Sequence, residues 1–178
     1  MLIIAFATAQ VSASPSTLFD GKQVRLELDY PTFGTAFYAA NATVGSAVEF
    51  PHPVFAPYVD VDFTDTTVHF AWITSNFFNS ASFNGYWIRD IDGTIPKFVD
   101  VRLDPITNLV GMSSSRIFFD ADNIVISMAG LSFTAETVMQ INVNSVPEPT
   151  SPCIVLLGAI GVANWRNRSY VVSRRRIK

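Results

Sequence analysis

The stretch VDVDFTDTTVHFAW, at residues 59–72, shows the pattern that decides the fold class of this chain. Apolar side chains recur at every second position in residues 59–63 and again in residues 68–72. Successive side chains of a β-strand point to opposite faces of a sheet, so this period of two predicts strands with one buried and one solvated face. No stretch of ten or more residues shows the 3.6-residue period of a helix.

The same alternation recurs along most of the chain and predicts a body made of strands. Further predicted strands lie at residues 24–28, 99–103, 117–119, 124–128 and 138–143, with one slip in the alternation of the last. Turn-forming sequences separate the strands, namely Asp20-Gly21, Asn84-Gly85, Asp92-Gly93, Asp104-Pro105 and Ala121-Asp122-Asn123. About eight to ten short strands with this spacing predict an all-β fold, an antiparallel β-sandwich, with a jelly-roll topology as the alternative.

The C-terminal segment carries three features in a specific order. Residues 146–151 read VPEPTS, residues 153–163 form an apolar run, and a basic tail follows. The basic residues of that tail are Arg166, Arg168, Arg174, Arg175, Arg176 and Lys178. A Pro-Glu-Pro signature, a hydrophobic segment and a terminal arginine cluster resemble the PEP-CTERM sorting signal of exported bacterial proteins.

This resemblance implies how the C-terminal segment works. An exosortase-like membrane enzyme would recognise Pro147, Glu148 and Pro149 as an extended peptide and process the anchor. The apolar run would enter lipid, and the arginines would act as a stop-transfer signal that keeps the C-terminus in the cytoplasm. The uninterrupted run has 11 residues, against roughly 20 for a spanning helix, so a span of residues 152–172 would need snorkelling arginines. The alternative is a disordered tail with a cationic end.

The N-terminal segment points to export independently. Residues 2–9 are an apolar core, and Val11-Ser12-Ala13 fits the small-residue rule for signal peptidase. The first basic residue is Lys22, so the signal lacks its usual positive start. The alternative is an edge strand or a buried helix of a cytosolic domain. We therefore expect a signal peptide at residues 1–13, which is either truncated at its start or degenerate. A β-sandwich body follows at residues 14–144. The linker, the Pro-Glu-Pro signature, the hydrophobic segment and the basic tail occupy residues 145–178.

The charge of the body excludes some partners. Residues 14–146 carry 14 acidic and 6 basic side chains, a net charge of about −8. Nucleic-acid binding requires clustered Lys and Arg, so a nucleic-acid partner is not expected. An acidic surface tolerates cations or neutral polysaccharide. The single cysteine, Cys153, lies in the apolar run, so the chain forms no internal disulfide and depends on its core for stability.

Catalytic and metal-binding residues are sparse. His52 and His69 lack the spacing of a zinc site, and no serine lies in a Gly-x-Ser-x-Gly elbow. Paired acids do recur, at Asp60 and Asp62 with Asp65, at Asp90 and Asp92, and at Asp120 and Asp122, which Asn123 follows. Calcium is one interpretation of these pairs, but none forms the twelve-residue calcium loop, and capping of turns is favoured. We expect no catalytic residues, no bound metal and no cofactor.

Aromatic residues gather around one Asn-rich loop. Phe77, Phe78, Phe83, Tyr86 and Trp87 surround residues 76–84. Exposed Tyr and Trp rings could stack on sugars while the amides bind hydroxyl groups. The favoured interpretation is that these rings fill the core, because most aromatics of the chain are Phe.

Two functions follow from these observations. The first is an exported, non-catalytic cell-surface or extracellular-matrix protein. Its expected partners are signal peptidase, an exosortase-like enzyme and, through the C-terminal segment, the membrane. In this case the precursor enters the inner membrane, and the product reaches the cell surface or medium. The alternative is a carbohydrate-binding or carbohydrate-active module that acts on exopolysaccharide.

Overall fold

The computed structural model describes residues 18–52, 56 and 58–146. Within these residues the fold is all-β, and every pair of neighbouring strands is antiparallel. This confirms the prediction of an all-β fold with antiparallel strands. The predicted signal peptide and the segment from Pro147 onwards lie outside the described residues. The last strand ends at Ser145, one residue inside the predicted linker.

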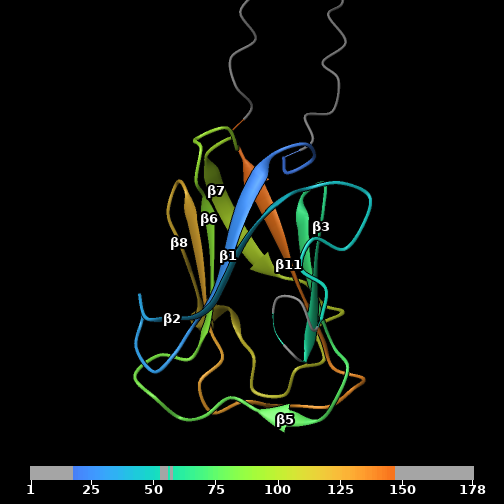
Figure 1. The fold of residues 1–178 in the computed structure, drawn as a ribbon, viewed down its shortest axis with the longest axis vertical. Coiled ribbons are helices and arrows are strands. Elements are labelled where there is room, and N and C mark those ends of the chain that lie inside the picture. Colours follow the sequence, from blue (N-terminus) through green and yellow to red (C-terminus); the bar gives the residue numbers. More distant parts are fainter. Residues whose placement is uncertain (1–17, 53–55, 57, 147–178) are drawn as a thin grey trace, which may run out of the picture. The chain divides into compact units, whose positions relative to one another are not determined.

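The larger sheet has five strands in the order β2-β1-β6-β9-β8 (Figure 1). Their bounds are β1 Gln23–Asp29, β2 Ala36–Thr43, β6 Gly85–Asp90, β8 Ile117–Phe119 and β9 Asn123–Ser127. A single 3₁₀ turn, η1 at Ser114–Arg116, precedes β8. In the part of the chain that the structure describes, no helix is long and apolar enough to cross a membrane.

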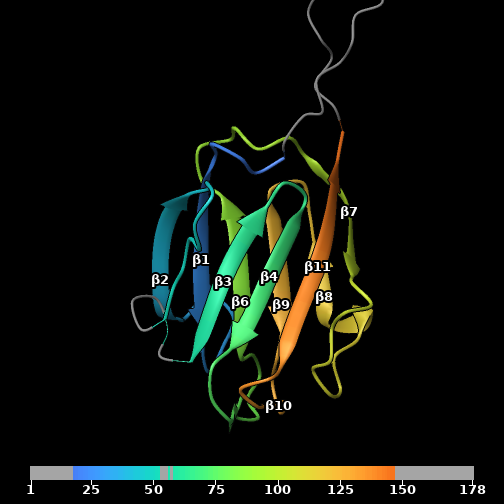
Figure 2. The same cartoon turned by 90° about the vertical axis from the view of Figure 1, so that its right-hand side faces the viewer.

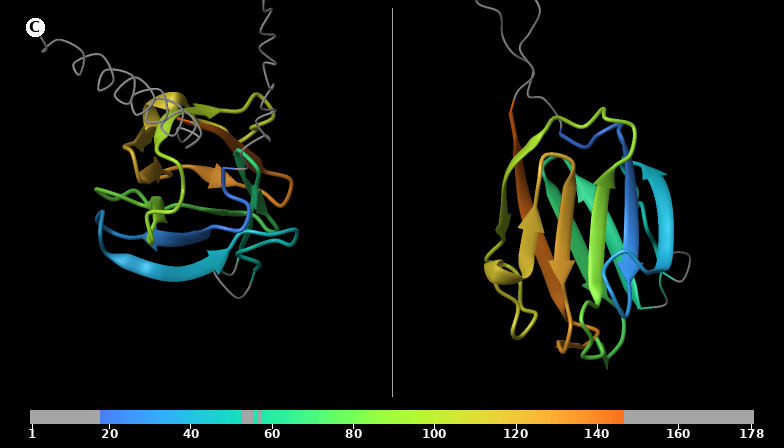
Figure 3. Two further views of the ribbon diagram at one scale, coloured as in Figure 1. Left: turned by 90° about the horizontal axis from the view of Figure 1, so that it is seen from above. Right: turned by 90° about the vertical axis from the view of Figure 1, so that its left-hand side faces the viewer.

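A second sheet has four strands in the order β3-β4-β11-β7. Their bounds are β3 Val59–Thr64, β4 Thr67–Trp72, β7 Phe98–Leu103 and β11 Val138–Ser145. Two short strands, β5 Asn76–Phe77 and β10 Ser132–Phe133, pair separately. Figures 2 and 3 show the two larger sheets as separate layers, and their buried side chains belong to one hydrophobic core.

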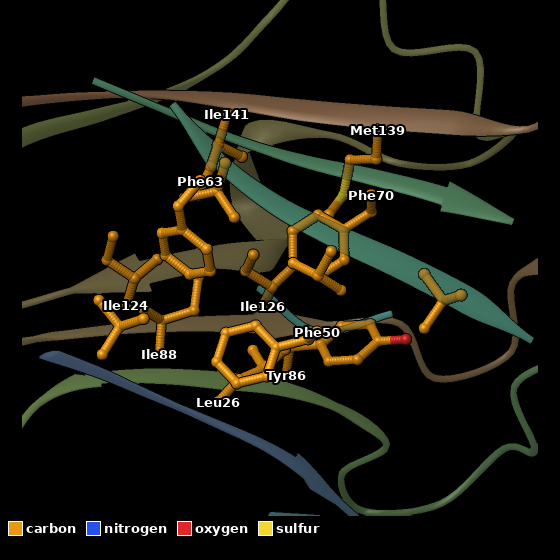
Figure 4. Close-up of a cluster of buried hydrophobic side chains, with 14 of the residues drawn as sticks. Leu26, Phe50, Phe63, Phe70, Tyr86, Ile88, Ile124, Ile126, Met139 and Ile141 are labelled. Carbon is orange, nitrogen blue, oxygen red and sulfur yellow. The ribbon is translucent and has the colours of Figure 1, made fainter. Parts of the chain in front are cut away.

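The stretch at residues 59–72 forms the β3–β4 hairpin, as its alternation predicts. Val61 pairs with Phe70 and Phe63 with Val68, so the apolar side chains of both strands face the core. Asp65 occupies the turn with φ 39°, a left-handed conformation that Asp tolerates better than most residues. Figure 4 shows Phe63 and Phe70 opposite side chains of the five-stranded sheet, among them Tyr86 and Ile88.

Two local predictions are wrong, each for a physical reason. In β7 the alternation 99/101/103 fails, because Phe98 and Val101 are buried while Val99 is exposed. The pairing of β7 with β11 shifts register between Asn144 and Ser145, and an irregularity of this kind changes which side chains face the core. The predicted turn at Asn84-Gly85 is instead the start of β6.

Gly85 is required by the close approach of two strands. A Cβ at this position would lie 2.0 Å from the backbone oxygen of Ile126 in β9, which cannot move without disturbing the sheet. We therefore predict that Gly85→Ala lowers the free energy of unfolding by several kcal/mol, on the order of 3 or more, or prevents folding. Chemical denaturation followed by far-UV circular dichroism measures the change.

Gly45→Ala is the matched control, because a Cβ at Gly45 meets nothing within 4 Å. Its free energy of unfolding should stay within about 0.5 kcal/mol of the wild-type value. Equal stability of the two variants would show that β6 does not approach β9 as described.

Candidate functional site

An aromatic cavity of about 380 Å³ opens at one end of the sheets. At this end β1 and β4 finish and β2, β3 and β6 begin. The volume falls within the range of small-ligand pockets. Its lining residues are Leu28, Tyr30, Phe37, Tyr38, Ala56, Tyr58, Val59, Trp72, Asn76, Phe77, Phe78, Asn79, Asn84, Tyr86 and Phe133.

The inner wall of the aromatic cavity consists of packed, buried rings. Trp72 lies 5.3 Å from Phe133 and 6.3 Å from Phe78, measured between ring centroids. Tyr86 contacts Phe78 at 6.1 Å. Contacts at these distances fix the rings in place, so the inner wall is preformed by the hydrophobic core.

The rim of the cavity is aromatic as well, but its rings are exposed. Phe37 is 63% exposed, Phe77 61% and Tyr58 42%. Tyr30 lies edge-to-face with Phe37 at 6.4 Å. Folding leaves these apolar rings in water, and exposed apolar side chains gathered around a cavity are typical of a binding surface.

Two polar groups at the cavity form no hydrogen bond with the described residues. The side chains of Trp72 and Tyr86 are 2% and 1% exposed, and neither Trp72 Nε1 nor the Tyr86 hydroxyl forms a hydrogen bond with any described residue. Figure 4 shows the Tyr86 oxygen at the margin of the core, directed away from the other labelled side chains. Asp29 Oδ1 is the one fully buried side-chain polar atom without a partner among the described residues, so neither of these two atoms is fully enclosed. Both can therefore reach a molecule in the cavity.

The Tyr86 hydroxyl keeps its proton, as a hydrogen-bond donor must. Complete burial raises the pKa of its phenol far above the ordinary value. The hydroxyl therefore stays neutral under all physiological conditions and can both donate and accept a hydrogen bond. Trp72 Nε1 can only donate.

Amide side chains complete the polar part of the cavity. Asn84 Nδ2 donates to the Asn79 carbonyl over 3.1 Å, and Asn76 Oδ1 accepts from the Phe77 amide over 2.9 Å. Both bonds lie within residues 76–84, so they fix the conformation of the loop itself. Among the residues that the structure describes, the lining contains no carboxylate, amine, guanidinium or imidazole group. The aromatic cavity thus offers flat apolar faces and neutral hydrogen-bonding groups.

The predicted aromatic cluster is divided between two faces of the sheet. Phe77, Phe78 and Tyr86 line the aromatic cavity, while Phe83 and Trp87 contact Phe33 on the outer face. Tyr86 and Trp87 are neighbours in β6, so their side chains point in opposite directions. The sequence pattern identified the loop correctly but not this division.

A second hollow, the outer groove, lies on the exposed face of the five-stranded sheet. It has a volume of about 320 Å³ and is lined by Phe33, Trp87, Phe118, Phe119, Asp120, Asn123 and Val125. The polar and ring atoms of Trp87 already have partners here. Its Nε1 donates to Asn123 Oδ1 over 3.1 Å, and the Arg89 guanidinium lies 4.2 Å from its ring. The outer groove therefore shows no equivalent of the unpartnered donors in the aromatic cavity.

The predicted acidic pairs act mainly as turn caps. Asp90 Oδ1 accepts from the Gly93 amide over 3.0 Å, Asp92 from Thr94, and Asp120 from the Asp122 amide over 2.8 Å. Hydrogen bonds of this kind lower the pKa of Asp92 and Asp120, whereas burial raises the pKa of Asp90. The described residues include no group of three or more His, Cys, Asp or Glu placed to hold a metal ion.

Of the remaining predicted acids and histidines, Asp60, Asp62 and His69 lie in β3 and β4, whereas His52 lies in a turn outside these strands. Asp60 Oδ1 accepts from the His52 backbone and contacts His52 Nδ1, both at 2.7 Å. Asp62 pairs with His69 across the β3–β4 hairpin. Sequence reasoning did not connect His52 with Asp60, because eight residues separate them. The predicted sorting residues, from Pro147 to Arg176, lie outside the described part of the chain.

Removing only the Tyr86 hydroxyl tests whether this group contributes to the stability of the fold. Because this group has no protein partner, we predict that Tyr86→Phe changes the free energy of unfolding by no more than about 0.5 kcal/mol. Tyr86→Ala, the contrasting variant, should lose about 3–5 kcal/mol through the cavity it leaves. Urea denaturation measures both. A loss above about 1.5 kcal/mol in Tyr86→Phe would mean that the hydroxyl stabilises the fold itself.

Asp29 positions the loop between the two hollows. Its Oδ2 accepts from the Gly34 amide over 2.7 Å, while its fully buried Oδ1 has no partner among the described residues. The loop that it holds carries Tyr30 at the aromatic cavity and Phe33 at the outer groove. Burial raises the pKa of the Asp29 carboxyl, with a further contribution from the negative charge of Glu27.

This raised pKa predicts a defined pH dependence. The native state binds the Asp29 proton more tightly than the unfolded chain, so this stability is present at low pH and is lost as the pH rises through the raised value. Asp29→Asn removes the titration. As the pH rises from about 3 to about 7, the free energy of unfolding of Asp29→Asn should therefore increase relative to that of the wild type.

Asp104→Asn is the control of opposite sign. Hydrogen bonds from the Ile106 amide and from Asn142 lower the pKa of Asp104, so its contribution is present at neutral pH and is lost on acidification. As the pH rises across the same range, the free energy of unfolding of the wild type should thus increase relative to that of Asp104→Asn. Urea denaturation at each pH measures the difference for both variants. The same trend in both variants would contradict the burial of a charged Asp29.

Comparison with known proteins gives no match for this chain. No family model matches it, and neither a curated protein nor a solved structure does so. The role of the aromatic cavity is therefore inferred from its own residues.

Proposed function

We propose that the chain is an exported, non-catalytic cell-surface or extracellular-matrix protein whose body binds neutral carbohydrate in the aromatic cavity. The observation that carries the proposal is an aromatic lining, uncharged among the described residues, in which two donors, Trp72 Nε1 and the Tyr86 hydroxyl, form no hydrogen bond with the described residues. A ligand that presents both hydroxyl groups and an apolar face would satisfy this site.

The body that holds the cavity is proposed to be a β-sandwich. The four- and five-stranded sheets bury their inner faces in one core, and Phe70 of β4 contacts Tyr86 of β6 at 4.8 Å. Contacts of this kind across two layers are typical of a sandwich. A jelly-roll topology remains the alternative arrangement of the same elements.

Carbohydrate fits the chemistry of the cavity better than other ligands. A pyranose ring has apolar C–H faces that pack on aromatic rings, and its hydroxyl groups form hydrogen bonds with Trp, Tyr and Asn. A charged ligand would lose its hydration without gaining an ionic partner, because the lining is neutral. The body's net charge of about −8 also disfavours acidic polysaccharide.

Binding is favoured over hydrolysis by the same lining. Most glycosidases place two carboxyl groups on either side of the scissile bond, one as acid and one as base or nucleophile. The aromatic cavity presents rings and amides where such carboxylates would stand. A carbohydrate-active enzyme is therefore the second candidate, and no cofactor is proposed for either.

The location of the protein is proposed from both ends of the sequence. Residues 1–13 resemble a signal peptide, which signal peptidase would remove. Pro147, Glu148 and Pro149, with the apolar run and arginines beyond them, resemble an exosortase-processed sorting signal. The precursor would be inserted in the inner membrane by its C-terminal segment. The processed body would then meet exopolysaccharide at the cell surface or outside the cell.

A rim residue provides the test of carbohydrate binding. We predict that Phe77→Ala weakens binding to neutral oligosaccharides by about tenfold, because it removes one stacking ring at the cavity mouth. Phe118→Ala is the matched control. Phe118 is equally exposed, at 60% against 61% for Phe77, but lies at the outer groove. Isothermal titration with glucan, mannan and galactan oligosaccharides measures the affinities, with a uronic-acid oligosaccharide as the charged comparison.

The outcomes distinguish the alternatives. Loss of affinity in Phe77→Ala alone supports the aromatic cavity as the binding site. Loss in Phe118→Ala alone would transfer binding to the outer groove. Failure of every neutral oligosaccharide to bind the wild-type chain would contradict the proposed function, and cleavage of any of them would favour the enzyme.

A further inference from the structure

Asp29, the last residue of β1, holds a buried carboxyl group of which one oxygen has no partner among the described residues. The residue is 0% exposed. Its Oδ2 accepts from the Gly34 amide over 2.7 Å, whereas no described residue donates to Oδ1. A buried carboxylate needs partners for both oxygens, because burial of a charge costs far more than burial of a neutral polar group. This position is therefore suited to the neutral acid and poorly suited to the ionised one.

The charged groups around Asp29 do not neutralise it. Arg25 Nε and Arg89 Nη1 both donate to Glu27 Oε1, over 2.6 Å and 3.0 Å, so the acid that they bind is Glu27. Strand β2, on the other side of β1, carries no charged side chain. Burial has the largest effect on the pKa of Asp29 and raises it. The Gly34 hydrogen bond and the charge of Arg89 oppose this effect, the charge of Glu27 adds to it, and the resulting pKa is raised.

The loop of residues 30–35, the bridging loop, follows Asp29 directly. All its residues after Tyr30 are exposed, and none of its side chains carries a charge. The Tyr30 amide donates to the Thr35 carbonyl over 3.0 Å, which closes the loop, and the bond from Gly34 to Asp29 ties it to the sheet. An exposed loop of this kind opens at a lower cost in free energy than a core strand does.

The bridging loop contacts both hollows. Tyr30 lines the aromatic cavity, and the Phe33 ring lies 4.7 Å from the Trp87 ring at the outer groove, measured between centroids. The Pro31 carbonyl accepts from the Phe83 amide over 3.0 Å, which joins the bridging loop to the uncharged, Asn-rich loop before β6. A displacement of the bridging loop therefore changes the rim of the cavity and the wall of the outer groove together.

We propose that Asp29 is a pH-sensitive latch for the bridging loop. The neutral carboxyl keeps the loop on the sheet, and loss of its proton favours an open loop that returns the carboxylate to water. The direction follows from linkage, because an opening that lets the acid ionise more easily is itself favoured by ionisation. Since the pKa is raised while the loop is closed, the closed loop is most stable at low pH and loses stability as the pH rises through that raised value. The inference is independent of the proposed carbohydrate binding.

Hydrogen exchange at the Gly34 amide measures the opening, because this amide is bonded to Asp29 when the loop is closed. NMR of the isotope-labelled full chain in mild detergent follows the exchange, and each rate is divided by the intrinsic rate at that pH. We expect the protection of Gly34 to fall by about tenfold between about pH 3 and pH 7. The fall should end once the Asp29 carboxyl, followed by its own ¹³C signal, is ionised. The buried Val143 amide should stay more protected at every pH, as expected for a local opening.

Two variants assign the opening to one carboxyl group. Asp29→Asn removes the titration and keeps an oxygen that can accept from Gly34, so the corrected protection of Gly34 should not change with pH. Asp104→Asn is the matched control, because Asp104 accepts from the Ile106 amide and from Asn142, both outside the bridging loop. In this control the protection of Gly34 should follow the wild-type curve.

The proposal fails in three cases. The first is a Gly34 protection that stays constant with pH in the wild type or in folded Asp104→Asn. The second is an equal fall in folded Asp29→Asn, which would assign the opening to another group. The third needs no variant: an Asp29 carboxyl that titrates at the ordinary value of about 3.9, or a protection that keeps falling after this carboxyl is ionised, would separate the loop from Asp29. If Asp29→Asn does not fold, the two wild-type measurements decide the matter.

Discussion

The contact between Phe70 and Tyr86 is the interaction on which the described structure depends. It joins β4 of one sheet to β6 of the other at a ring distance of 4.8 Å, within a core that has no disulfide to support it. The same tyrosine belongs to the aromatic cavity through its hydroxyl. One side chain thus serves both the packing of the sheets and the polar chemistry of the site, with its ring in the core and its oxygen at the cavity.

This sharing explains why the cavity is preformed. Trp72, Phe78 and Phe133 form its inner wall and are also members of the hydrophobic core, so the site is as rigid as the fold. Its rim is built from exposed rings that contribute little to stability, such as Phe37 and Phe77. Recognition can therefore vary at the rim while the inner wall stays fixed, a division that is common in binding sites on rigid scaffolds.

The sequence predicted the fold class because strand alternation is local information. The pattern at residues 59–72 specifies both strands and the buried face of the hairpin. Local patterns could not predict that Gly85 lies against Ile126. The Asn84-Gly85 pair has the local signature of a turn, and the close approach of Gly85 to Ile126 arises only when the sheet forms. The loop at residues 76–84 was located from its amides and rings. Tyr30 follows β1, Tyr58 precedes β3 and Trp72 ends β4, so their convergence depends on the pairing order of the strands.

The central claim is that the aromatic cavity binds neutral carbohydrate. The chain has three tryptophans, of which Trp72 lines the cavity and Trp87 the outer groove, while Trp165 lies outside the described residues. Fluorine NMR of 5-fluorotryptophan-labelled protein, with signals assigned by single Trp→Phe variants, tests the claim directly. Titration with a neutral oligosaccharide should shift the Trp72 signal saturably and leave the Trp87 signal unchanged. A shift of Trp87 alone, or no shift with any neutral oligosaccharide, would contradict the account.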